Sequence, residues 1–356
     1  MKIKLSFTLK ACLFLFVFTL KAQIPAYYNN IDFSKKGNDL KTQLSSLIIA
    51  THSNLIPYTS TSTDTWDVIT HSDLAEDNRF VLLIYGYNDT DGIFQTDRTR
   101  EITSLCNLNS CVGLWNREHV FAKSLATPSL ETSSPSAGTD VHNLRAADSQ
   151  MNSSRNNRIF EEGIGNAQIT AQGNFYPGDE WKGDVARIIM YMYLRYPSQC
   201  PPNNVALSNN NFNIDMPDIF LKWNIEDPVS TFEINRNDVI ASYQGNRNPF
   251  IDNPYIATII WGGNSAIDSW SVLSSNNNID STYNDLVIYP NPVNDKIFIK
   301  NNTNSTIKTI IYSLNGKELK SDKTLNQIDV SELSKGIYFL KLIRENTTQI
   351  RKIVKY

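Results

Sequence analysis

The first two thirds of the chain contain apolar positions with the spacing of helices. Residues three or four positions apart lie on one side of a helix, and this spacing is followed by Leu40, Leu44, Leu47 and Ile48. A second apolar stripe runs through DVARIIMYMYLRYP, residues 184–197, and Pro197 ends that helix because proline cannot continue it. Ser230 followed by Glu233 has the capping-box spacing and opens a third helix. This part of the chain is therefore predicted to be rich in helices.

Strand patterns are few in the helical part and dominate the C-terminal part. A buried strand is predicted over RFVLLIYG, residues 79–86. Over residues 285–356, Asn, Gly and Ser turn signals separate the short β-rich runs DKIFIK, IKTIIYSL, KGIYFLKLI and QIRKIVKY, as in a small sandwich. The predicted fold class is α+β, with a helix-rich domain followed by a small all-β sandwich.

Two further segments set the domain boundaries. Residues 1–22 combine early lysines with an apolar run too short to span a bilayer and end in a small residue, which is typical of a secretory signal peptide. Residues 269–284 are rich in Ser and Asn and lack periodicity, which indicates a linker. We therefore expect a helix-rich domain at 23–268 and the β domain at 285–356.

Charge is distributed unevenly between these domains. The whole chain has net charge −3, and loss of the four lysines in residues 1–22 makes it −7. Residues 285–356 hold 12 Lys and Arg against 7 Asp and Glu, net +5, which leaves −12 on residues 23–284. Nucleic-acid affinity usually rests on a basic surface, so the helix-rich domain is not a general polyanion binder. The segment from Arg117 to Arg158, however, contains five basic and four acidic residues. We therefore expect any binding of nucleic acid to be local to this segment.

Three cysteines remain after the signal peptide. Cys106 and Cys111 are close enough to close a small disulfide loop in an oxidising exterior, which would leave Cys200 unpaired. The alternative is three buried thiols without a chemical role. The spacing is a poor zinc signal, because no further Cys or His lies nearby.

Polar clusters between residues 115 and 158 contain the candidate catalytic and metal-binding residues. They read NREH at 116–119, TDVHNLR at 139–145 and NSSRNNR at 152–158, and two of the four histidines lie in them. Phosphodiester hydrolysis needs a base, a hard cation and positive groups on phosphate. His119 suits the base, Glu118 a metal ligand, and either Asn143 or Asn152 the second ligand. Candidates for phosphate contact are Arg145, Arg155 and Arg187.

Strand geometry raises an objection to pairing Glu118 with His119. Adjacent residues of a regular strand point to opposite faces, so both can reach one phosphate only at a bulge, a strong twist or a strand end. We therefore expect an irregular backbone between Arg117 and Val120.

The order of four motifs resembles the endonuclease I family of secreted and periplasmic bacterial nucleases. The motifs are WNREHVFAKS, TDVHNLRAADSQMNSSRNNR, WKGDVARIIMYMYLRY and QGNRNPFIDNP, and the resemblance covers nearly all of residues 25–263. It implies a ββα-metal (His-Me finger) fold with His119 as general base and with Glu118 and Asn152 as Mg²⁺ ligands.

The same resemblance assigns further residues. The family's D-L-H-N-L motif is matched by Asp140, His142 and Asn143, with Val141 in place of Leu. These residues are expected to support the site residues and not to contact the substrate. Arg155 and Arg187 match family arginines and are expected near phosphate. The chain departs from the family after the EH pair, where a proline and an aromatic residue are frequent, and at Asn253, where a histidine is frequent.

The C-terminal domain carries a resemblance of its own. YPNPV at 289–293, IYSLNGK at 311–317, LSKGIY at 333–338 and the basic end KIVKY are similar to the type A sorting domain of the type IX secretion system in Bacteroidota. The resemblance implies export across the outer membrane, in agreement with the signal peptide.

Together these patterns predict a secreted, metal-dependent endonuclease that cleaves DNA, with RNA as an open alternative and with little sequence specificity. The expected cofactor is Mg²⁺, with Mn²⁺ or Ca²⁺ as alternatives. The expected partners are nucleic acid and the type IX secretion machinery, and we expect a monomer that is not inserted in the membrane. The competing hypothesis is a secreted binding or adhesion protein on a nuclease-like scaffold. A zinc hydrolase is disfavoured because no HExxH motif is present.

Overall fold

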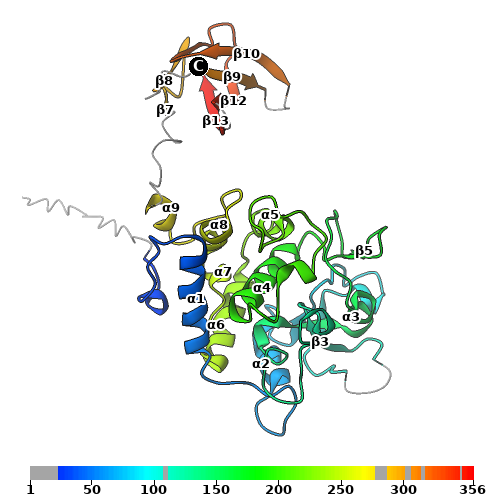
Figure 1. The fold of residues 1–356 in the computed structure, drawn as a ribbon. Helices are drawn as coiled ribbons and strands as arrows, with labels where there is room; N and C mark the ends of the chain where they lie inside the picture. Colours follow the sequence, from blue (N-terminus) through cyan, green and yellow to red (C-terminus); the bar gives the residue numbers. More distant parts are fainter. Residues whose placement is uncertain (1–22, 107–110, 277–286, 301–305, 314–316, 345–346) are drawn as a thin grey trace, which may run out of the picture. The chain divides into compact units, whose positions relative to one another are not determined.

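The computed structural model describes residues 23–106, 111–276, 287–300, 306–313, 317–344 and 347–356. The predicted signal peptide and residues 277–284 of the predicted linker lie outside these residues. The chain divides into two compact units between Ser275 and Asn276 (Figure 1).

The first unit combines helices with three small antiparallel sheets. Its helices are α1 (Gly37–Thr51), α2 (Thr65–Ser72), α3 (Ser149–Arg155), α4 (Lys182–Arg195), α5 (Asp218–Glu226), α6 (Thr231–Gln244), α7 (Pro249–Asp252), α8 (Tyr255–Trp261) and α9 (Leu273–Asn276). Its strands pair as β1 (Phe80–Leu82) with β2 (Thr99–Glu101), β3 (Trp115–His119) with β4 (Leu144–Asp148), and β5 (Gln168–Ile169) with β6 (Phe175–Tyr176). The predicted mixture of helices and strands is confirmed.

Helix α4 lies among the other helices of this unit (Figure 1), and its residues from Gly183 to Leu194 are all buried. It ends at Arg195, two residues before Pro197, as the sequence predicts. Of the apolar face predicted for helix α1, Leu40, Leu44 and Ile48 are buried, and Leu47 is partly buried against the same core.

Helix α6 confirms the predicted capping box. The Ser230 side chain accepts from the Glu233 amide, and the Glu233 carboxylate accepts from the Ser230 amide. The helix ends at Gly245, whose φ of 91° is left-handed and therefore favours glycine.

Two sequence predictions in this unit hold only in part. The strand predicted at residues 79–86 is limited to β1. Leu83 N–H still donates to the Arg98 carbonyl, next to β2, but Ile84 N–H donates to the Ala146 carbonyl of β4. The predicted linker begins with packed residues, since Trp270 and Leu273 are buried in the core of the first unit.

The second unit is built of strands. They are β7 (Val287–Tyr289), β8 (Lys296–Lys300), β9 (Ile307–Tyr312), β10 (Glu318–Thr324), β11 (Gln327–Asp329), β12 (Gly336–Arg344) and β13 (Thr347–Lys355). They form two antiparallel sheets in the orders β10-β9-β12-β13 and β11-β8-β7. Buried aliphatic side chains from both sheets share one core. Across the described residues, no helix is both long and apolar enough to cross a membrane.

A disulfide precedes β3. Cys106 and Cys111 are joined, whereas Cys200 is a buried free thiol. The Cys111 carbonyl accepts from the Ser149 hydroxyl at the start of α3, so the disulfide loop is tied to that helix.

Removal of this disulfide should destabilise the protein modestly. In the chain-entropy account, a loop of this length stabilises the folded state by about 2 kcal/mol. We expect the double variant Cys106→Ala/Cys111→Ala to lose that amount of unfolding free energy in urea. Adding reductant should lower the stability of the wild type only; an equal loss in the double variant would contradict the assignment.

Candidate active site

Strands β3 and β4 and helix α3 form one continuous unit. The two strands pair antiparallel, from Trp115 opposite Asp148 to His119 opposite Leu144. Asp148 ends β4 and also caps α3, because its carboxylate accepts from the amides of Gln150 and Met151. Helix α3 therefore starts directly from the strand and lies against β3.

An open cavity of about 330 Å³ lies where β3 and α3 meet. Its lining comes from β3, from the segment that follows β3, and from α3 and the residues after it: Asn116, Arg117, Glu118, His119, Ala122, Lys123, Ser124, Asn152, Ser153, Arg155, Asn156 and Asn157. The predicted base and both predicted metal ligands thus border one cavity.

An irregular backbone was predicted between Arg117 and Val120. The register of β3 with β4 runs one to one through His119, so there is no bulge in the strand. The strand ends at His119 and the chain bends at Val120, which is the strand end that the sequence analysis gave as one of three possibilities. Glu118 reaches toward α3 and His119 toward the segment around Gly138, and the cavity is bordered by residues of both faces at this strand end.

His119 is held in one tautomer by its surroundings. Its Nε2 lies 2.8 Å from the Gly138 carbonyl oxygen, which can only accept, so the proton is on Nε2 and Nδ1 keeps its lone pair. The ring stacks on Tyr58 with centroids 5.7 Å apart. Burial lowers the pKa of His119 to about 4, and the Lys123 charge acts in the same direction. The imidazole is therefore neutral and able to accept a proton near neutral pH.

Glu118 is a buried carboxylate, with only 2 % of its surface exposed. Its Oε1 accepts from the Tyr85 hydroxyl at 3.1 Å and lies 3.3 Å from Arg155 Nη1. Burial raises the pKa of Glu118 to about 7 against the opposing charge of Arg155. One guanidinium is thus not enough to offset the loss of water around this carboxylate.

Asn152 projects from α3 and is oriented by a neighbour on β3. Its Nδ2 donates to Asn116 Oδ1 at 2.8 Å, which leaves Asn152 Oδ1 available to a ligand. Asn116 and Glu118 are two positions apart on β3, so they share the face that meets α3. Carboxylate and amide oxygens of this kind are the ligands that Mg²⁺ prefers.

The site fits a cation held by few protein ligands. Within the described parts of the chain, no cluster of three His, Cys, Asp or Glu side chains has metal-binding spacing. Glu118 with Asn152 supplies two oxygens, and Mg²⁺ commonly accepts one or two protein ligands and keeps its waters.

The Asp140, His142 and Asn143 side chains are buried behind the cavity. Asn143 Oδ1 accepts from the Phe121 amide at 2.7 Å, which fixes the chain just after His119 and occupies the oxygen that a metal would need. Asp140 accepts from the Tyr191 hydroxyl at 2.8 Å and from the Tyr196 hydroxyl at 3.0 Å. These contacts tie the segment before β4 to α4.

Comparison with known proteins gives the family. The Endonuclease I family model matches residues 36–255, more than half of the chain. The chain belongs to the Endonuclease I family. Residues 287–356 match the secretion system C-terminal sorting domain. The chain is accordingly a nuclease, a hydrolase of nucleic acid, and its sorting domain marks it for secretion.

Two curated relatives are similar over most of their length. An extracellular ribonuclease of Bacillus amyloliquefaciens is 36% identical over 259 residues, covering 69% of this chain and 81% of the relative. An extracellular ribonuclease of Bacillus subtilis (strain 168) is 38% identical over 256 residues, covering 67% of this chain and 80% of the relative.

In this Endonuclease I family member, the three arginines predicted to contact phosphate bind carboxylates and carbonyls of the protein itself. Arg145 is fully buried and lies 2.9 Å from Asp73 and 2.8 Å from Asp184. Arg187 is fully buried too, and donates to Glu233 through Nε at 2.6 Å and Nη2 at 2.8 Å. Neither residue lines the cavity, so neither matches the predicted phosphate contact.

Arg155 lines the cavity, but its guanidinium is hydrogen-bonded to backbone carbonyls around it. Its Nη1 donates to the His119 and Asn156 carbonyls at 3.2 and 3.0 Å, and its Nη2 to the Val120 carbonyl at 2.7 Å. With Glu118 as a further partner, this guanidinium holds the site together and is not free for substrate.

Four residues that shape the site were not predicted from the sequence. Asn116 stands inside the NREH cluster, and its strand spacing from Glu118 was an available signal. Tyr58, Tyr85 and Gly138 lie in separate segments far from that cluster, and nothing local in the sequence connects them to His119 or Glu118.

Arg187→Met separates a structural role from substrate binding. It leaves Glu233 buried without its cation, and breaking such a pair costs roughly 3–5 kcal/mol. We expect that loss in urea unfolding, whereas Arg98→Met, which removes an exposed ion pair with Glu180, should cost about 1 kcal/mol or less. Wild-type stability combined with weaker substrate binding would show that Arg187 contacts phosphate.

Proposed function

We propose that this nuclease hydrolyses phosphodiester bonds of RNA and DNA outside the cell, with little sequence specificity and with a divalent cation, most simply Mg²⁺. The observation that supports this most strongly is the grouping of Glu118, His119 and Asn152 around one open cavity. A strand-borne histidine and carboxylate beside a helix-borne asparagine correspond to the ββα-metal arrangement.

His119 is proposed as the general base. Its Nδ1 lone pair takes the proton of the water that attacks phosphorus, while Nε2–H keeps its bond to the Gly138 carbonyl. That carbonyl also stabilises the imidazolium formed after proton transfer. Because the pKa of His119 is lowered to about 4 by burial, nearly all of the free enzyme carries the base form at neutral pH.

Glu118 and Asn152 are proposed to hold the cation. When bound, Mg²⁺ supplies positive charge to the phosphate and to the leaving oxygen. The Glu118 carboxylate and the Asn152 Oδ1 would hold it, and Asn116 would keep the Asn152 amide in the required orientation. Loss of a hydrogen bond that orients a metal ligand commonly changes metal affinity or activity by roughly 10–100-fold.

The lining of the cavity supports recognition of the backbone and not of bases. Its members outside the proposed trio are arginine, lysine, serine, asparagine and alanine side chains, with no aromatic platform for a base. The names of the two relatives, extracellular ribonucleases, support RNA as a substrate. The phosphodiester bond, which RNA and DNA share, supports DNA as well.

Export is proposed to use the type IX secretion machinery, with the C-terminal unit as the recognised signal. The match of residues 287–356 to a secretion sorting domain supports this proposal. The catalytic unit would then act free or attached at the cell exterior, as a monomer.

His119→Ala tests the base. We expect cleavage of plasmid DNA and of RNA by the purified protein to require Mg²⁺ and to stop in EDTA, and the variant to cleave roughly 10²–10⁴-fold more slowly. His71→Ala is the matched control, because His71 is exposed on α2 and lies outside the cavity. Cleavage that persists in EDTA, or equal rates in His119→Ala and wild type, would refute the mechanism.

Glu118→Gln and Asn152→Ala test the ligands. Loss of one of two protein oxygens should move the Mg²⁺ titration of activity to a roughly tenfold or higher concentration, since even the loss of a residue that only orients a ligand has an effect of that size. Glu76→Gln, an exposed carboxylate away from this cavity, should leave the titration unchanged. Titrations that coincide with the wild type would exclude Glu118 and Asn152 as ligands.

A further inference from the structure

Three cationic side chains line the cavity, and the protein itself uses two of them. Arg155 is bound to Glu118 and to backbone carbonyls, as described above. Arg117 donates to Thr65 Oγ1 at 2.8 Å, and its guanidinium lies 3.5 Å from the Tyr58 ring centroid and 4.1 Å from that of Trp66. A phosphate could recruit either guanidinium only by breaking these contacts.

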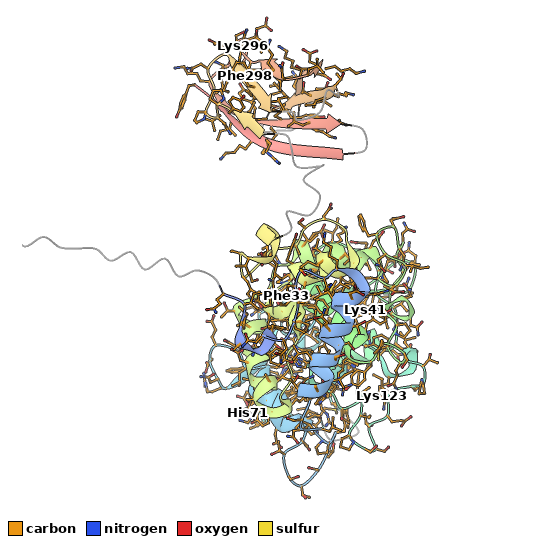
Figure 2. All side chains as sticks on the ribbon, turned by 60° about the vertical axis from the view of Figure 1, so that its left-hand side comes forward. Phe33, Lys41, His71, Lys123, Lys296 and Phe298 are labelled. Atoms are coloured by element: carbon orange, nitrogen blue, oxygen red, sulfur yellow. A yellow bond between two sulfur atoms is a disulfide. The ribbon has the colours of Figure 1, made fainter. Side chains whose placement is uncertain are left out.

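Lys123 differs from both arginines. It is exposed and lies at the periphery of the first unit (Figure 2). The contact of its ammonium is a long 3.4 Å hydrogen bond to Thr132 Oγ1. In the part of the chain that the structure describes, no carboxylate lies within ion-pair distance of Lys123 Nζ. Its charge is therefore available to a ligand at low cost.

The backbone under this side chain is fixed. The Lys123 carbonyl accepts from the Leu130 amide at 3.1 Å, and the Leu125 carbonyl accepts from Asn204 Nδ2 at 2.9 Å. Ser124 Oγ accepts from Asn157 Nδ2 at 3.1 Å, which joins this segment to the chain after α3. Lys123 thus combines a long side chain with a fixed backbone, four residues after His119. This combination suits a group that contacts a phosphate of a bound substrate.

The charge of this unit also favours a cation here. Residues 23–284 carry net charge −12, and among the described residues the ion-pair partner of Glu118 in the cavity is Arg155. A polyanionic substrate approaching this unit meets repulsion unless a local positive group offsets it.

We propose that Lys123 is the cationic side chain of this cavity that binds the phosphate backbone of the substrate, in place of the arginines. The inference rests on the proposed function, which gives the cavity a nucleic-acid substrate. The Lys123 ammonium contacts a phosphate oxygen and adds affinity without reading the base.

Binding without turnover tests this directly. The full-length mature protein, in EDTA, is titrated against fluorescent single-stranded RNA and DNA of one sequence at several salt concentrations. We expect Lys123→Gln to weaken binding about tenfold at low salt and to reduce the slope of log affinity against log salt by about 0.7, the value for one single-strand phosphate contact. Lys123→Arg should restore both.

Lys35→Gln is the charge-matched control, because Lys35 is exposed and lies outside the cavity. It should leave the slope unchanged, and equal slope changes in the two Gln variants would overturn the proposal by showing an effect of net charge only. Melting curves that match the wild type show that Lys123→Gln is folded.

Cleavage assays separate this inference from the proposed function. With Mg²⁺, Lys123→Gln should raise KM with little change in the Mg²⁺ midpoint; a shifted midpoint with unchanged KM would overturn the phosphate role. Failure of the wild type to cleave refutes the proposed function. The binding data in EDTA would then still show whether Lys123 contacts the phosphate backbone. Normal cleavage together with wild-type binding by Lys123→Gln overturns the inference alone.

Discussion

The buried guanidinium of Arg155 is the interaction on which the site depends. It projects from the last residue of α3 and joins that helix to the end of β3 through the carbonyls of His119 and Val120 and the carboxylate of Glu118. Residues three apart share a face of a helix, so Asn152 lies on the same side of α3 as Arg155. Docking Arg155 on the strand end thus also brings the Asn152 amide to the cavity that Glu118 borders.

Burial has opposite effects on the two neighbouring groups of the strand end, and both effects suit a hydrolytic site. It raises the pKa of the Glu118 carboxyl to about 7 and lowers that of His119 to about 4, because each loses water around its charged form. A divalent cation would favour the ionised carboxylate, which the single shared guanidinium does not fully stabilise. The histidine needs no cation in order to stay a base. Environments that separate two pKa values in this way assign different roles to adjacent residues.

The sequence was sufficient to select candidate residues that border one cavity, and insufficient to identify what the arginines bind. Polar clusters and motif order pointed to Glu118, His119 and Asn152, which the fold brings to one cavity. Charge alone could not distinguish a phosphate ligand from an internal ion pair, since the partners of Arg145 and Arg187 lie 72, 39 and 46 positions away along the chain. The strand objection was met by a strand end, which the sequence could name only as one of three possibilities: alternation of faces is local, whereas the place where a strand ends depends on its tertiary neighbours.

The internal ion pairs explain why these arginines are not available to a substrate. Asp73 binds both Arg145 and Arg236, and Arg145 continues to Asp184 on α4, while Arg187 on the same helix binds Glu233 on α6. Each buried charge must be paired, because an unpaired one costs several kcal/mol, roughly. Arginines used in this way fix β4, α4 and α6 to one another behind the cavity and contribute little field to the solvent. Residues 23–284 carry net charge −12, so under the proposed mechanism attraction for a polyanion rests on the cavity, where Lys123 and a divalent cation would supply it. Affinity built on so few charges would respond to individual contacts more than to the charge of the whole protein, and contacts to phosphate would not depend on the sequence of bases.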